Sequence, residues 1–105
     1  MTLDETLGDE LWERLNDVMT AVSCVGIDAC MHDSVFPNND RDALVRETHE
    51  METQLVNQTQ QGPPSPDRRP ALTDLLINTE HRIREICEQH HVDLSELIRK
   101  HRLLT

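Results

Sequence analysis

The sequence predicts an all-α protein, a small bundle of about four helices. Apolar residues recur at helical spacing in several stretches, only three of the 105 residues are Gly, and aromatic residues make up 2% of the chain. Few glycines and few aromatic or β-branched runs disfavour a sheet, because strands are built from such residues. The length allows one small domain with a thin core, so we expect residues 1–105 to form a single unit that dimerises.

Charge divides this domain into two segments. Residues 1–67 carry 14 Asp and Glu against three Arg, a net of −11, whereas residues 68–105 carry six acids against seven basic residues. A Pro-rich stretch lies where the charge changes. We expect an acidic helical segment of two helices over 1–61, a stiff extended linker over 62–70, and a C-terminal helix pair over 71–105.

The first predicted helix begins near the N-terminus and must end before Phe36, because the proline that follows disfavours helical geometry at this residue. Its apolar residues follow one another at steps of three and four, the stripe of an amphipathic helix. We expect the stripe to form a core that continues into a dimer or partner interface. Its members are Leu7, Leu11, Trp12, Leu15, Val18, Met19 and Val22.

The second predicted helix follows Pro37. We expect an N-cap from the polar run Asn38–Asp40, because Asn and Asp accept hydrogen bonds from the first free amides of a helix. A helical face follows, made of Leu44, Thr48, Met51 and Leu55. Polar residues from Asn57 onward predict its end.

Two more helices are predicted after the linker. Pro70 suits the first position of the third helix, where its missing amide costs nothing, and apolar spacing continues to about His90. Asp93 followed by Glu96 predicts a cap for the last helix, and Val92 can pack on Leu97 across that cap.

Residues 83–103 allow a second interpretation, a helix-turn-helix unit for DNA. The possible nucleic-acid contacts are Arg99, Lys100 and Arg102. Two features oppose this interpretation. His91 occupies a turn position that often needs a positive φ and glycine, and Asp93 and Glu96 would repel phosphate. A plain pair of helices with a solvated basic end explains the pattern better.

Metal-dependent sensing is a weaker hypothesis. Cys24, Cys30, Cys87 and His91 are ligand types that zinc favours, but the spacing of the first two differs from a tight zinc knuckle. Buried cysteines more often act as small apolar residues. We therefore expect no metal and no cofactor.

Catalysis is not predicted. His49 with Glu50 and Glu52, or His81 with Glu85, could be read as acid–base pairs, but such neighbours on a polar helix face are usually solvated. The serines lie in no nucleophile elbow. The sequence therefore argues against an enzyme.

An acidic N-terminal half is typical of a surface that meets a basic partner. The sequence predicts a small acidic regulatory protein of bacterial type that binds and inhibits or sequesters a protein partner such as a transcription factor. A DNA-binding regulator is the alternative. The odd number of cysteines, with no secretory signal and no long apolar span, predicts a cytoplasmic setting and no membrane partner.

Overall fold

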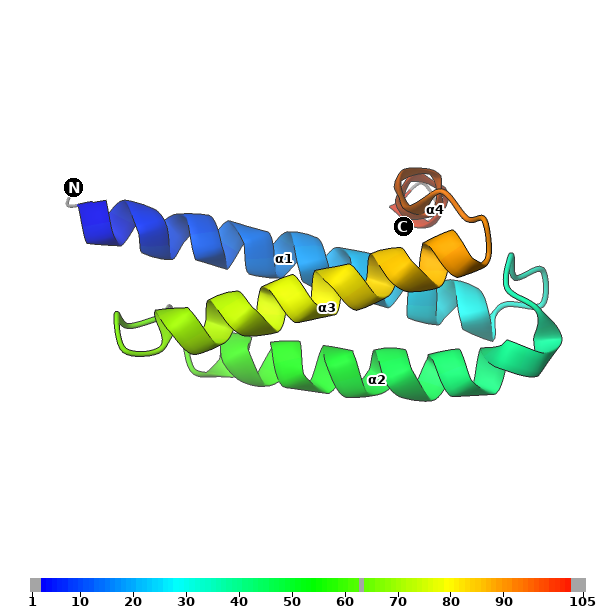
Figure 1. Ribbon diagram of the computed structural model, residues 1–105, viewed down its shortest axis with the longest axis horizontal. Helices are drawn as coiled ribbons and strands as arrows, with labels where there is room; N and C mark the ends of the chain where they lie inside the picture. Colours follow the sequence, from blue (N-terminus) through cyan, green and yellow to red (C-terminus); the bar gives the residue numbers. More distant parts are fainter. Residues whose placement is uncertain (1–2, 63, 103–105) are drawn as a thin grey trace.

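The chain is all-helical, as predicted, and its first three helices lie side by side along the long direction of the molecule (Figure 1). A computed structural model describes residues 3–62 and 64–102, with side chains over 10–62 and 64–101. The helices are α1 (Leu3–Cys30), α2 (Asn38–Gln60), α3 (Arg69–Gln89) and α4 (Leu94–Arg102). α4 is seen nearly end-on in Figure 1, beside the C-terminal half of α1.

Helix α1 is the centre of the fold, because it packs against each of the other three helices. Its buried residues follow the predicted steps of three and four, and Leu15, Val22 and Val25 are fully buried. Leu55 of α2 and Leu72, Leu76, Ile83 and Ile86 of α3 complete the same core. Burial of this apolar surface, at about 25 cal/mol per Å2, is the main force that holds the bundle together.

Gly26 lets α1 and α2 approach closely. A Cβ atom at this position would lie 2.9 Å from Oγ1 of Thr48, which is closer than real Cβ contacts. The Thr48 hydroxyl is buried and donates to the carbonyl of Leu44 at 2.8 Å, so it is satisfied within its own helix. The two helices therefore meet at Gly26, and the Thr48 hydroxyl that faces it is already hydrogen-bonded.

The turn between α1 and α2 is held by Arg41. Its guanidinium donates to the carbonyls of Met31 and Phe36, both at 3.2 Å. The predicted cap from Asn38–Asp40 is wrong, because Pro37 is the N-cap residue and no side chain caps the helix. Pro37 has extended geometry, so helical φ and ψ begin at Asn38 itself. The helix also continues past Asn57 to Gln60.

The Pro-rich stretch differs from the extended linker predicted over 62–70. The amides of Arg68 and Arg69 donate to the carbonyl of Ser65 at 3.0 and 3.2 Å, which forms a turn. Arg68 also donates to Oε1 of Gln58 at 3.0 Å. Pro70 lies in the first turn of α3, at its second position and so one residue later than predicted. The stretch folds back on α2 because these bonds join its end to that helix.

The turn between α3 and α4 forms a Schellman motif. The amide of Val92 donates to the carbonyl of Cys87 at 2.8 Å, and that of His91 to Glu88 at 3.2 Å. His91 has a φ of 55°, so this position does require the left-handed geometry that glycine adopts most easily. The predicted cap at Asp93 is confirmed, since its Oδ1 accepts from the Ser95 amide at 2.9 Å.

Candidate functional site

The predicted interface stripe of α1 is mainly part of the protein's own core. Leu15, Val18 and Val22 are buried against α2 and α3. Leu11, Trp12 and Met19 are partly exposed and pack on the edge of that core, and they keep surface for a partner. The side chain of Leu7 lies outside the described residues. The middle of the stripe is therefore buried inside the protein, because α2 and α3 pack against it.

Arginine side chains form ion pairs between helices of the bundle. Arg14 of α1 pairs with Glu80 of α3 at 3.0 Å. Arg82 of α3 donates to both carboxylate oxygens of Glu47 on α2, and its pKa is raised by that bond and by the charge of Glu47. These pairs join helices, so these guanidinium groups already have carboxylate partners within the bundle.

Many carboxylates remain free. Over residues 10–62, exposed acids of α1 and α2 have no ion pair to another described residue; they include Glu10, Glu13, Asp17, Asp42 and Glu50. Arg46 is also exposed on α2, but the acids outnumber it. The surface of the first two helices is therefore negative.

A buried ionic cluster joins α1, the turn after it and α4. Asp28 is fully buried, and its Oδ2 lies 3.0 Å from Nε2 of His101 and 3.2 Å from Nζ of Lys100. Its Oδ1 accepts from the Ser34 hydroxyl and the Val35 amide, both at 3.0 Å. His101 is only 5% exposed. One carboxylate thus holds three segments together.

The charge of Asp28 is stabilised by these bonds. Burial alone would raise its pKa, because a carboxylate loses solvation in the interior. The hydrogen bonds from Val35, His101, Ser34 and Lys100 outweigh burial and hold the pKa of Asp28 below its ordinary value. The carboxylate is therefore ionised at neutral pH.

Sequence spacing alone does not single out Asp28 or His101. The signal at Asp28 was an acid inside the apolar run Val25–Ala29, where a charge needs a partner. That partner lies 73 residues away and could not be identified from spacing.

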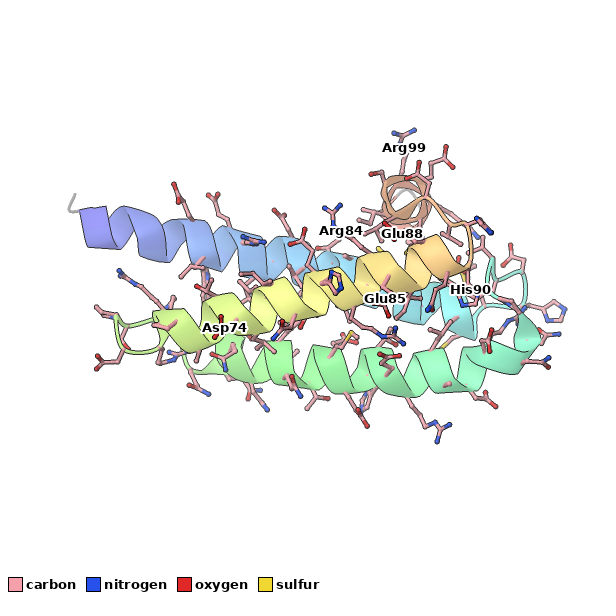
Figure 2. All side chains as sticks on the ribbon, in the orientation of Figure 1. Asp74, Arg84, Glu85, Glu88, His90 and Arg99 are labelled. Atoms are coloured by element: carbon pink, nitrogen blue, oxygen red, sulfur yellow. The ribbon has the colours of Figure 1, made fainter. Side chains whose placement is uncertain are left out.

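Of the possible nucleic-acid contacts, the two whose side chains are described do not form one exposed basic surface. Arg99 projects away from the bundle on α4 (Figure 2). Lys100 is bound to Asp28 and is 35% exposed, while the side chain of Arg102 lies outside the described residues. Because Asp93 and Glu96 are exposed at the start of α4, the helix end that would read bases is acidic.

The cysteines do not gather into a metal centre. Cys24 and Cys87 are buried and Cys30 is exposed. Within the described part of the chain, no group of three His, Cys, Asp or Glu residues has a geometry that could hold a metal ion. Burial, and then the charge of Asp93, raises the pKa of Cys87, which keeps its thiol protonated.

The possible acid–base pairs lie on the surface. Nε2 of His81 is 3.7 Å from Glu85, with side chains 79% and 44% exposed. His49 and Glu50 are exposed on α2. Glu52, the other acid considered with His49, is partly exposed on the same helix.

Comparisons with protein-family models, with curated proteins and with solved structures find no match for this chain. Among the described helices, none is long and apolar enough to cross a membrane.

Proposed function

We propose that this protein is a small acidic regulatory protein that binds a positively charged protein partner and inhibits or sequesters it, as an anti-activator of a transcription factor would. The proposal rests on one observation: basic side chains form ion pairs within the fold, whereas exposed acidic side chains of α1 do not. Arg14, Arg82 and Lys100 pair within the fold, whereas Glu13 and Asp17 are exposed and have no ion pair with another described residue. Free carboxylates on a rigid bundle attract a basic surface and speed its association.

The proposal includes no reaction. The ordered polar clusters of the bundle, around Asp28, Arg82 and Arg41, each bind helices or turns to one another. Because these hydrogen bonds join parts of the fold, we assign the three clusters a structural role in the proposal. The protein would act by covering its partner.

The setting of this protein is part of the same proposal. We expect a homodimer in a reducing bacterial cytosol, with the two N-terminal helices as the acidic recognition surface. No disulfide joins the cysteines of the described residues, which is compatible with that compartment.

The test is an affinity pull-down from source lysate, with and without nuclease. Glu13→Lys with Asp17→Lys changes the acidic surface of α1. Asp74→Lys with Glu88→Lys, on exposed positions of α3 labelled in Figure 2, makes the same charge change elsewhere. We expect a protein partner that survives nuclease, is lost from the α1 variant and is retained by the α3 variant.

Two results would reject the proposal. Equal loss from both double variants would indicate a nonspecific charge effect. Binding that nuclease removes, and that Arg99→Ala also removes, would favour the DNA-binding alternative, because phosphate contacts depend on such cations.

A further inference from the structure

A groove runs between α1 and α2 on the surface of the bundle. It has a volume of about 460 Å3 and is lined by Ser23, Gly26, Ile27, Met31, Val45 and Glu52, among others. The small side chains of Gly26 and Ser23 lie along the groove on the α1 side. Ile27 is 52% exposed and lies outside the buried core, on the wall of the groove.

Ile27 also borders a second hollow. This one, about 500 Å3, is lined by Asn16, Met19, Thr20, Cys24 and His101, together with Ser23 and Ile27. The two hollows therefore share Ser23 and Ile27 and continue across α1 toward α4. When two helices pack, the ridges of side chains on one fit into the grooves of the other. The exposed Ile27 side chain, with a hollow on each side, is a surface of this kind.

The charge around the groove indicates the occupant. Glu52 lies in the lining and accepts a hydrogen bond from Ser23 at 3.4 Å. His49 also lies in the lining, and Glu13 and Asp42 are exposed acids elsewhere on the same two helices. A second copy of this chain would bring its own acidic α1 and α2 against these groups, and like charges placed together oppose association.

We propose that the α1–α2 groove is the docking site for a cationic amphipathic helix of the partner protein, with Ile27 as the apolar contact and Glu52 as a charged one. This inference rests on the proposed function, since it names the part of the partner that the acidic surface receives. The bound helix would convert the three long helices into a four-helix arrangement.

The experiment uses the full chain and a synthetic helical peptide of Leu and Lys, with a Leu and Glu peptide of the same pattern as the charge control. Ile27→Gln removes the apolar contact. Ile77→Gln is the matched control, because Ile77 is 47% exposed on α3. We expect Ile27→Gln to weaken binding of the Leu/Lys peptide about tenfold, the loss expected when a half-buried Ile contact is removed, and Ile77→Gln to leave it unchanged.

Cys30 supplies an independent readout. It lines the groove and is exposed, whereas Cys24 and Cys87 are buried, so a thiol reagent modifies Cys30 first in the folded protein. We expect the Leu/Lys peptide to slow this modification and the Leu/Glu peptide to have no effect. Equal effects of the two peptides, or of the two Ile variants, would overturn the proposal.

Two further results separate this inference from the proposed function. Light scattering that shows a dimer for the native protein and a monomer for Ile27→Gln would assign the groove to a second copy and overturn the inference. A lysate partner that is lost from Glu13→Lys with Asp17→Lys but kept by Ile27→Gln would also overturn it, while the proposed function would stand.

Discussion

Nε2 of His101 lies 3.0 Å from Oδ2 of Asp28, in a pair that is almost completely buried. The contact joins the last described helix to the end of the first. Two buried ionisable groups are costly unless hydrogen bonds compensate, and Lys100, Ser34 and Val35 supply that compensation. The pair therefore helps to hold α4 in place, together with the buried side chain of Leu97.

Replacing Asp28 with Asn should destabilise the protein strongly. Asn keeps the shape but leaves Lys100 and His101 without a carboxylate, and breaking a buried ion pair costs about 3 kcal/mol. Urea unfolding should show this loss in the free energy of unfolding. Asp17→Asn, at an exposed position, is the control and should change it by less than about 0.5 kcal/mol. Equal stability of Asp28→Asn and the native protein would contradict the role assigned to the cluster.

Stability should fall in acid because of the same carboxylate. The pKa of Asp28 in the folded protein is lower than in the unfolded chain, where it is about 3.9. Its contribution is therefore fully present above the unfolded pKa and is lost as pH falls through the folded pKa. Thermal unfolding from pH 6 to pH 2 should show a smaller drop in Tm for Asp28→Asn than for the native protein. Parallel curves for the two proteins would contradict this.

Replacing His91 with Gly should stabilise the protein. His91 has a φ of 55°, and a residue with a Cβ pays about 1 kcal/mol there. Glycine removes that cost but adds freedom to the unfolded chain, so we expect a net gain of about 0.5 kcal/mol in urea unfolding. His91→Ala separates loss of the imidazole from relief of the backbone and should give no gain. A gain for Ala equal to that for Gly would refute the backbone explanation.

Gly26 and Thr48 should be energetically coupled. Gly26→Ala improves helix propensity but places a Cβ 2.9 Å from the Thr48 hydroxyl. We expect a net loss of stability in the native background and a gain in the Thr48→Ala background, where the hydroxyl is gone. A double-mutant cycle should give a coupling of about 1 kcal/mol, typical of residues in contact. Additive effects would show that the helices move apart without cost.

The local signals of the sequence identified each helix. Apolar steps of three and four predicted α1 through Leu15, Val18 and Val22, and Pro70 and Asp93 marked the starts of α3 and α4. These features depend on neighbours within one turn of helix, so they can be recognised without knowing the rest of the fold. The prediction of a cap at Asn38–Asp40 failed because Pro37 set the backbone at that point instead.

The sequence by itself determined that the chain is helical, where its helices lie, and that the N-terminal half is acidic. Only the tertiary structure decided that the middle of the α1 stripe is buried within the chain, that Lys100 is paired with Asp28, and that Ile27 stands between two hollows. Helix periodicity is a local property of the backbone, whereas these outcomes depend on how whole helices are oriented against one another.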